Sequence, residues 1–203
     1  MAAGNHFAAT VNGRRHEYYF SPPYRYYNGY VIYMERANGW QPVSAVTTVG
    51  RICGSFSSKG IIEKNPEGEF ADLNAFDAVF WNDRNRDGKV QRAECEIAKT
   101  DQPPTKKQQG KSGLPMSSGW GERMDTNCVF YMNGIYKVSP IGFSDDGAPL
   151  YGAGSLDKMT FNDSGDFVPV ADENLLLCLN TSGSRQAAHV AGFDTRTGAL
   201  RWE

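Results

Sequence analysis

The alternation of apolar and polar positions along the chain predicts short β-strands separated by tight turns. Residues 29–35 and 40–49 are rich in aromatic and β-branched side chains, and Ala37-Asn38-Gly39 between them is typical of a hairpin turn. Further strands are expected over residues 6–11, 77–81, 128–132, 135–139, 149–151, 166–171, 174–180, 189–194 and 199–202. Strands at this spacing indicate an all-β fold, which could be a sandwich, a barrel or a propeller.

The pattern breaks in the middle of the chain. Residues 91–99 are predicted to form a short helix that stops before Asp101-Gln102-Pro103-Pro104. Residues 101–119 hold few apolar side chains and many Lys, Gln, Gly and Ser, so we expect an exposed, flexible loop there. Gly110-Lys111-Ser112 resembles the end of a phosphate-binding loop, but position 105 is threonine where the first glycine is required. A nucleotide site is therefore not predicted.

Composition narrows the class of protein. With 203 residues, 40% of them hydrophobic and 22% charged, the chain is expected to fold as one globular domain over residues 1–203. A net charge of −2 gives no reason to expect nucleic acid or an anionic membrane as a partner. The sequence contains no apolar run long enough to span a membrane, and its start lacks the signal-peptide pattern. It is therefore expected to be cytosolic or a piece of a longer secreted protein.

The four cysteines leave two interpretations open. Cys53, Cys95, Cys128 and Cys178 are widely spaced and form no C-x-x-C pair, which argues against a zinc ribbon or a thioredoxin-type site. Their even number permits two disulfides, but buried thiols are equally compatible with the sequence.

Residues 83–94 carry the strongest chemical signal. Their sequence, D-R-N-R-D-G-K-V-Q-R-A-E, fits the calcium-loop template D-x-[DN]-x-[DN]-G-x5-E at every constrained position. Ca²⁺ takes six to eight oxygen ligands, and this template brings side-chain oxygens from positions 1, 3 and 5 into one turn around a glycine at position 6. Position 7 would offer its backbone carbonyl, position 9 a direct or water-mediated ligand, and position 12 both carboxylate oxygens. The predicted ligands are Asp83, Asn85, Asp87, Lys89, Gln91 and Glu94.

The predicted calcium loop favours a structural role over a sensor. Calcium sensors usually pair two helix-loop-helix units, and we find no second loop with this spacing. The basic residues Arg84, Arg86, Lys89 and Arg92 surround only three carboxylates, which should weaken the affinity for Ca²⁺. We therefore expect a local staple, with an affinity suited to extracellular calcium concentrations.

The end of the chain resembles a known repeat family. Residues 191–202, A-G-F-D-T-R-T-G-A-L-R-W, are similar to the repeat A-x-D-x-x-T-G-x-x-x-W of PQQ-type β-propellers. The resemblance implies a hairpin in which Asp194 and Thr197 fix the turn, Gly198 takes a positive φ and Trp202 packs between blades. Gly192 stands where alanine is usual. Quinone binding is not expected, because the chain has no adjacent cysteines.

A second resemblance covers residues 78–94. An aromatic strand that leads into a calcium loop is similar to inserts in large secreted bacterial propeller proteins of the planctomycete type. This resemblance implies an extracellular or periplasmic location. A closed propeller needs at least four four-stranded blades, whereas the expected strands suffice for about three. We therefore predict a partial or truncated propeller, from a longer chain, with the calcium loop and its short exit helix inserted at residues 82–100.

Other candidate sites have ordinary structural interpretations. The tyrosine-rich region could stack sugars or single-stranded nucleic acid, but strand packing is the favoured interpretation because few basic residues lie beside it. The histidines have no partner at ligand spacing, and four acidic residues could pair as acid and base only if the fold brings them together. These candidates are the tyrosines 18, 19, 24, 26, 27, 30 and 33, His6, His16 and His189, and Asp72, Asp77, Glu122 and Asp125.

The function predicted from the sequence is a calcium-binding structural or recognition segment, with a protein or a glycan as its partner. Enzymatic activity is less expected, because neither a G-x-S-x-G nor an H-E-x-x-H motif occurs. Two alternatives stay open: part of a propeller-fold polysaccharide hydrolase or lyase, and a carbohydrate-binding module that uses the tyrosine cluster.

Overall fold

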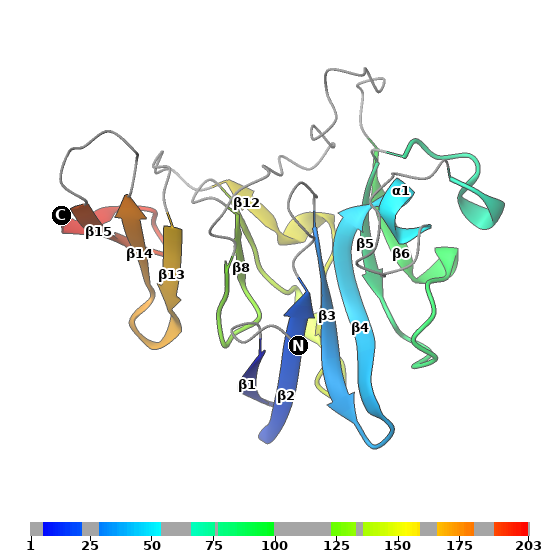
Figure 1. Ribbon diagram of the computed structural model, residues 1–203, viewed down its shortest axis with the longest axis horizontal. Helices are drawn as coiled ribbons and strands as arrows, with labels where there is room; N and C mark the ends of the chain where they lie inside the picture. Colours follow the sequence, from blue (N-terminus) through cyan, green and yellow to red (C-terminus); the bar gives the residue numbers. More distant parts are fainter. Residues whose placement is uncertain are drawn as a thin grey trace. The chain divides into compact units, whose positions relative to one another are not determined.

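The computed structural model is built almost entirely from antiparallel β-strands, which confirms the all-β class (Figure 1). It divides into two compact units: unit 1 comprises residues 1–118 and 140–154, and unit 2 comprises residues 119–139 and 155–203. Within the described part, the helices are too short and too polar to cross a membrane. The structure describes residues 6–21, 29–53, 66–75, 77–99, 123–132, 136–158, 166–180 and 189–202.

Unit 1 is organised around a six-stranded antiparallel sheet in which every strand pairs with the next one in sequence. The predicted hairpin around Ala37-Asn38-Gly39 is confirmed as the connection between the third and fourth strands. Its strands are β1 (His6–Val11), β2 (Arg14–Ser21), β3 (Tyr30–Arg36), β4 (Gly39–Thr48), β5 (Ala78–Asn82) and β6 (Cys95–Ala98).

One face of this sheet buries an apolar row that crosses four strands. Val31, Ala45, Trp81 and Cys95 are successive cross-strand partners, so their side chains lie on the same face. The short helix α1 (Val49–Ile52) and the 3-10 turn η1 (Gly68–Phe70) supply further side chains to the same core cluster. We call this cluster the Trp81 core; its buried members are Ala45, Val49, Ile52, Phe70, Leu73, Val79 and Trp81.

The opposite face is contacted by the segment 140–154, which contains the two short paired strands β10 (Gly142–Phe143) and β11 (Pro149–Leu150). Tyr151 is fully buried, and its ring lies edge-on to Tyr30 at 5.7 Å between centroids. The carboxamide of Asn82 donates to the Tyr151 carbonyl and accepts from the Tyr151 N–H, both at 2.8 Å. Tyr18 donates its hydroxyl to the Gly147 carbonyl at 2.6 Å. Strand β5 is therefore fastened on both faces of the sheet.

Unit 2 contains two four-stranded antiparallel sheets. The first has the order β12-β9-β8-β7, and the second follows the chain as β13-β14-β15-β16. Tyr131, Leu176, Cys178, Ala191 and Phe193 form its buried core cluster. The strands are β7 (Arg123–Met124), β8 (Phe130–Met132), β9 (Tyr136–Val138), β12 (Leu156–Lys158), β13 (Asp166–Val170), β14 (Leu175–Asn180), β15 (His189–Asp194) and β16 (Leu200–Trp202). The 3-10 turns η3 (Ala153–Ser155) and η4 (Ala171–Glu173) precede β12 and β14.

One local prediction is wrong. Instead of a helix over 91–99, the chain makes one 3-10 turn, η2 (Arg92–Glu94), and then enters β6. The strand forms because residues 95–98 find hydrogen-bonding partners in β5, and tertiary pairing overrides a weak local helix preference. Residues 14–16 belong to β2, where they pair with β1. The loop predicted at 101–119 lies outside the described residues.

We expect Asn82→Ala to destabilise the protein by about 3 kcal/mol, because the substitution leaves the N–H and the carbonyl of buried Tyr151 without these partners. Urea unfolding measures the loss. The control is Asn38→Ala at the exposed β3–β4 turn, which should change stability by less than about 0.5 kcal/mol. Equal stability of the two variants would show that the Asn82 bonds do not hold the segment 140–154 to the sheet.

Candidate metal centre

The loop 83–94 connects two neighbouring strands of the unit 1 sheet. Trp81 and Cys95 are cross-strand partners on either side of the loop, so β5 and β6 form a hairpin with residues 83–94 as its loop (Figure 1). The Asp83 N–H donates to the Val43 carbonyl at 2.9 Å, which extends the pairing of β5 with β4 by one residue. The first and last predicted ligand positions therefore lie at the base of a hairpin.

Short side chains within the loop bind the backbone of the following residues. Asp83 Oδ1 accepts from the Gly88 N–H at 3.2 Å. Asn85 Oδ1 accepts from the Asp87 N–H at 3.0 Å, and Asp87 Oδ1 accepts from the Lys89 N–H at 2.8 Å. These side-chain-to-backbone bonds turn the chain back on itself. They place template positions 1, 3 and 5 on one tight turn, as the sequence predicts.

Two residues of the loop adopt positive φ. Gly88 has φ +67°, which fits the sharp bend predicted for position 6 of the template. Arg86 has φ +66°, an uncommon conformation for a residue with a Cβ atom. Nothing in the template signals the conformation of Arg86, because its position is unconstrained.

Glu94 closes the loop by folding back onto its beginning. Its side chain is buried, and Oε1 accepts from the N–H groups of both Arg84 and Asn85 at 2.9 Å. Its other oxygen, Oε2, accepts from the indole N–H of Trp81 at 3.2 Å. The carboxylate at position 12 thus contacts positions 2 and 3 and is fixed to the Trp81 core.

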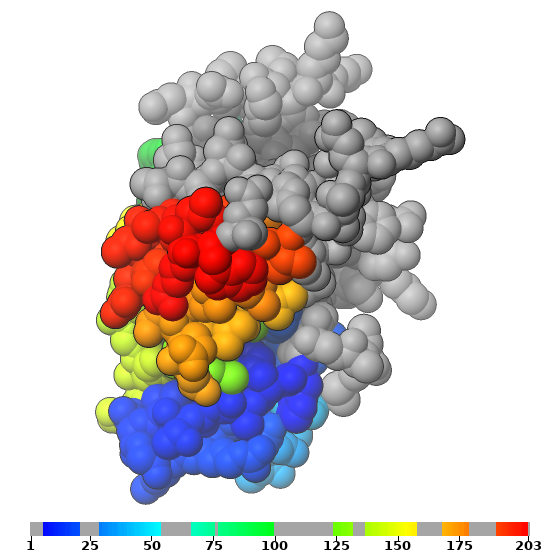
Figure 2. All heavy atoms as spheres, turned by 90° about the vertical axis from the view of Figure 1, so that its left-hand side faces the viewer, coloured from blue at the N-terminus to red at the C-terminus, as the bar shows by residue number. Residues whose placement is uncertain are grey.

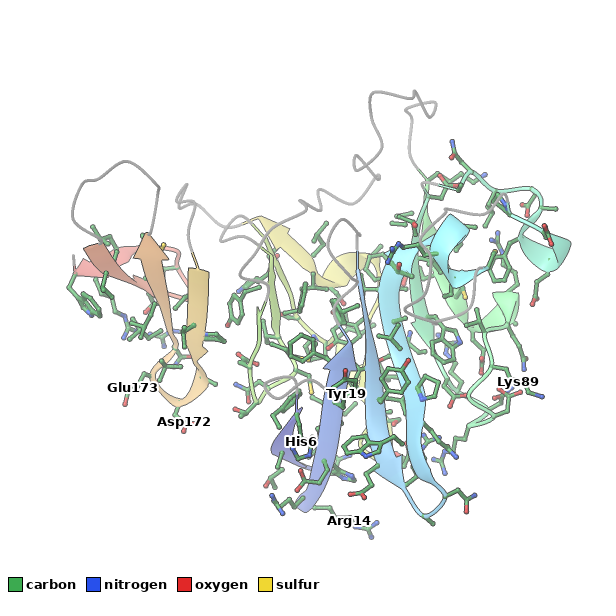
Figure 3. All side chains as sticks on the ribbon, viewed as in Figure 1. His6, Arg14, Tyr19, Lys89, Asp172 and Glu173 are labelled. Atoms are coloured by element: carbon green, nitrogen blue, oxygen red, sulfur yellow. The ribbon has the colours of Figure 1, made fainter. Side chains whose placement is uncertain are left out.

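The remaining two predicted ligands differ in orientation. Gln91 donates from Nε2 to Asp87 Oδ2 at 2.8 Å, so its carboxamide is directed toward position 5. Lys89 is exposed, and its side chain points away from the strands (Figure 3). This orientation suits the predicted role of Lys89, in which only the backbone carbonyl would face a metal.

The acidic side chains of the loop are not gathered around one point. Among the described residues, no group of three or more His, Cys, Asp or Glu side chains is arranged so that it could hold a metal ion. The three carboxylates of the loop bind backbone N–H groups and neighbouring side chains, as the hydrogen bonds above describe. The donor set nevertheless fits calcium, because it consists of oxygens only and a carboxylate oxygen with one hydrogen bond keeps further acceptor capacity. Binding would require Glu94 to turn from the amides of Arg84 and Asn85.

An arginine from outside the loop provides a positive charge at its first position. The Arg36 side chain is 15% exposed, with Nη1 3.4 Å from Asp83 Oδ2 and Nη2 2.8 Å from Asp146 Oδ2. Arg86 of the loop places Nε 3.4 Å from the same oxygen of Asp146. These ion pairs join the loop to the segment 140–154. The sequence does not indicate that Arg36 and Asp146 belong to this site, since no local pattern links them to a loop so distant in sequence.

Arg36 lowers the pKa of both carboxylates that it contacts, but their net pKa shifts are opposite. Burial raises the pKa of Asp83, and the charges of Glu94 and Asp87 add to the increase, while the Gly88 N–H and Arg36 oppose it. Burial also acts to raise the pKa of Asp146, but the Ser144 hydroxyl, at 2.6 Å, and the two arginines bring that pKa below its usual value. Negative charge in the loop is therefore only partly compensated by the protein.

The exit of the loop is attached to the η1 region. The Arg92 N–H donates to Glu69 Oε2 at 2.9 Å, and the guanidinium lies 5.7 Å from the centre of the Phe70 ring. Asp72, one of the acid/base candidates, is a largely exposed partner of Arg92 at 3.9 Å. The contacts of Arg92 thus hold the end of the loop against the layer that covers the Trp81 core.

The other acid/base candidates fix turns. Asp77 is buried in unit 1 and accepts from the Asn74 N–H at 2.9 Å. Asp125 is buried in unit 2, where its Oδ1 accepts from the N–H groups of Asn127 and Val129. The Tyr131 hydroxyl donates to Asp125 Oδ2 at 3.2 Å. Burial raises the pKa of Asp125 despite these bonds. Glu122 lies outside the described residues.

The described tyrosines pack against other residues. Tyr18 and Tyr30 are buried in unit 1. The rings of Tyr19 and Tyr33 lie 5.9 Å apart and are tilted by 48°, and Tyr19 meets Trp40 at 69° (labelled Tyr19 in Figure 3). Tilted rings pack edge to face rather than forming a flat stacking platform, which favours the packing interpretation. Tyr24, Tyr26 and Tyr27 lie outside the described residues.

The histidines are distributed over different surroundings. His6 Nε2 lies 2.9 Å from Glu17 Oε2. His16 lies against Gly147, where an added Cβ would be only 2.6 Å from its Nε2. His189 belongs to β15, and its side chain is outside the described part of the structure.

The hairpin between β15 and β16 has the turn that the repeat resemblance implies. Asp194 Oδ1 accepts from the N–H groups of Arg196 and Thr197 at 2.9 and 3.1 Å. The Thr197 hydroxyl accepts from the Ala199 N–H at 3.2 Å. Gly198 has φ +71°, and its N–H donates to the Asp194 carbonyl at 2.8 Å. The expected turn roles of Asp194, Thr197 and Gly198 are thereby confirmed.

Trp202 explains why glycine is suitable at position 192. Gly192 and Trp202 are cross-strand partners, and a Cβ built on Gly192 would lie 2.5 Å from Trp202 Cε2. The indole therefore occupies the space where an alanine side chain would be. Trp202 is 45% exposed, so its predicted packing between blades is not tested by these contacts.

Comparisons of the chain with protein-family models, with curated proteins and with solved structures find no match. The propeller and secreted-protein resemblances accordingly stay predictions from the sequence.

The Asp194 turn predicts a specific dependence of stability on pH. Hydrogen bonds from Arg201 and Arg196 lower the pKa of Asp194 below its usual value. The ionised form therefore stabilises the fold above the unfolded-state pKa, about 4, and this contribution is lost as pH falls through the lower folded-state pKa. In thermal unfolding, wild type and Asp194→Asn should differ in Tm at neutral pH, and the difference should shrink below about pH 4.

The control for this experiment is Asp172→Asn in η4, an exposed acid at another turn of the same sheet (Figure 3). Its Tm should follow that of wild type across the pH range. A difference between wild type and Asp194→Asn that stays constant down to low pH would contradict the assigned role of the Asp194 charge.

Proposed function

We propose that the loop 83–94 binds Ca²⁺ and that the ion acts as a structural staple for the β5–β6 hairpin. The main observation in support of this proposal is that all the oxygen donors of the calcium-loop template lie on one tightly turned hairpin loop. Asp83, Asn85, Asp87, Gln91 and Glu94 would contribute side-chain oxygens. Lys89 would contribute its backbone carbonyl.

The two ends of the loop support a role as a staple. At the exit, Glu94 is bound to Trp81 in the Trp81 core. At the entry, Asp83 shares Arg36 with Asp146, which belongs to the segment on the opposite face. Calcium would supply the positive charge that the loop carboxylates lack. The bend at Gly88 would help to hold the entry of the loop in place. Arg36 would do the same by orienting Asp83. Restraining both ends would stabilise the attachment of both covering layers to β5.

The charges around the loop support weak affinity. Arg36 competes for Asp83, and the exposed loop residues Arg84 and Arg86 add further positive charge. Weak sites of this type are filled at the calcium concentrations found outside cells. The proposal therefore includes an extracellular or periplasmic location for the protein. At a calcium concentration ten times the Kd, the ion would stabilise the folded state by about 1.4 kcal/mol.

We infer further that unit 2 is a propeller-type segment with a scaffolding or recognition role. The order β13-β14-β15-β16 supports this inference, because a propeller blade is a four-stranded antiparallel sheet. The exposed apolar side chains of this sheet include Val168, Val190 and Trp202. Figure 2 shows the sheet in orange and red. Such a sheet could contact a neighbouring blade or a protein or glycan partner. The six-stranded sheet of unit 1 has two strands more than a blade, so it does not support the count of about three blades.

Calorimetric titration with CaCl₂ tests the calcium proposal. We expect wild type to bind with a Kd near the millimolar range, and about 10 mM Ca²⁺ to raise its Tm by roughly 5 °C. Asp87→Asn should reduce the affinity about tenfold, because it removes one carboxylate charge from an exposed position that supports no core contact.

Asp172→Asn serves as the matched control, since it removes an exposed carboxylate from a turn in unit 2. It should titrate like wild type. Absence of both binding heat and a calcium-dependent change in Tm for wild type would disprove the proposal. Equal affinity of Asp87→Asn and wild type would place the ion elsewhere.

A further inference from the structure

The cysteines are divided evenly between the two units. Four cysteines allow three disulfide connectivities. Cys53 and Cys95 belong to unit 1, whereas Cys128 and Cys178 belong to unit 2. Only one of the three connectivities keeps both bonds within a unit, and it pairs Cys53 with Cys95. All four residues are thiols in the structure.

Cys95 has a defined place on the sheet of unit 1. It is the first residue of β6 and continues the row of Val31, Ala45 and Trp81 across the face that carries the Trp81 core. Its side chain is half-buried and packs against that core.

Cys53 reaches the same core from the covering layer. It is the C-cap of α1, and its N–H donates to the Val49 carbonyl at 3.1 Å. Its half-buried side chain packs against the Trp81 core, as Cys95 does. Cys53 and Cys95, which are far apart in sequence, thus place their side chains against one cluster from two different layers.

We propose that Cys53 and Cys95 form a disulfide in an oxidising environment, joining the end of α1 to the start of β6. The bond forms by thiol–disulfide exchange with a small-molecule disulfide such as oxidised glutathione. One protein thiolate attacks the glutathione disulfide and releases one glutathione thiol. The second protein thiolate then attacks the mixed disulfide and releases the other. Two protein thiols become one disulfide, and two electrons and two protons pass to the two glutathione molecules.

The position of this bond gives it a structural consequence. A disulfide requires Cα atoms within about 7 Å, so it would fix the α1 cap over the end of the Val31–Cys95 row. Cys95 directly follows Glu94, and the bond would thereby restrain the exit of the loop 83–94. The cross-linked segment contains η1 and β5. The disulfide would lower the conformational entropy of this segment in the unfolded chain and would thereby stabilise the folded state. The inference does not depend on calcium binding by the loop.

Refolding in a redox buffer tests the proposal. Full-length protein is reduced, unfolded and then refolded in a mixture of reduced and oxidised glutathione without calcium. Remaining thiols are blocked with an alkylating reagent, and the digest is mapped by mass spectrometry without reduction. We expect a peptide pair linked through Cys53 and Cys95, and a Tm about 10 °C higher than that of the reduced protein.

Cys53→Ser is the matched variant, because Cys53 is only half-buried at a helix cap and serine preserves its size. In the oxidised state this variant should lose the linked peptide pair and the gain in Tm, while its reduced form should unfold near the reduced wild type. Recovery of Cys53 and Cys95 as alkylated thiols would overturn the proposal. Linkage of either residue to Cys128 or Cys178 would also overturn it.

Discussion

The hydrogen bond between Trp81 and Glu94 is the interaction on which the organisation of unit 1 depends. Trp81 is the largest fully buried side chain of the described structure, and its indole N–H must find an acceptor when it is removed from water. Glu94 provides that acceptor and uses its other oxygen to bind two backbone N–H groups at the loop entry. One carboxylate thereby accepts the hydrogen bond of the buried indole N–H and also closes the loop. The register of β5 and β6 follows from this arrangement, since Trp81 pairs directly with Cys95.

The placement of charge follows from the same geometry. The loop concentrates carboxylates at the base of a hairpin, next to an apolar core in which uncompensated charge is costly. Arg36 offsets part of the negative charge and carries the connection to Asp146. The oxygen donors can therefore be satisfied in two ways, by protein N–H groups as the structure has them or by a hard cation as we propose. Calcium would have to compete with those internal bonds, which is why the proposed affinity is weak.

The sequence predicts those features that local physical chemistry determines. The hairpin of β3 and β4, the bend at Gly88 and the Asp194 turn each depend on a few neighbouring residues, and each is confirmed. The helix predicted over 91–99 is wrong because residues 95–98 respond to the backbone of β5 rather than to their own propensity. The contacts of Arg36 with Asp83 and Asp146 could not be predicted, because they exist only after distant segments meet on the sheet.

Terbium luminescence tests the central claim most directly, because Tb³⁺ is a hard, oxygen-seeking cation that can replace Ca²⁺ and is excited by energy transfer from a nearby indole. Trp81 donates to Glu94, so a cation in the loop would lie close to its ring. We expect terbium emission on excitation of tryptophan, displacement of the terbium by excess Ca²⁺, and an affinity for terbium about tenfold lower in Asp87→Asn. Tryptophan-sensitised emission that persists unchanged in Asp87→Asn, or no sensitised emission from wild type, would contradict calcium binding by the loop 83–94.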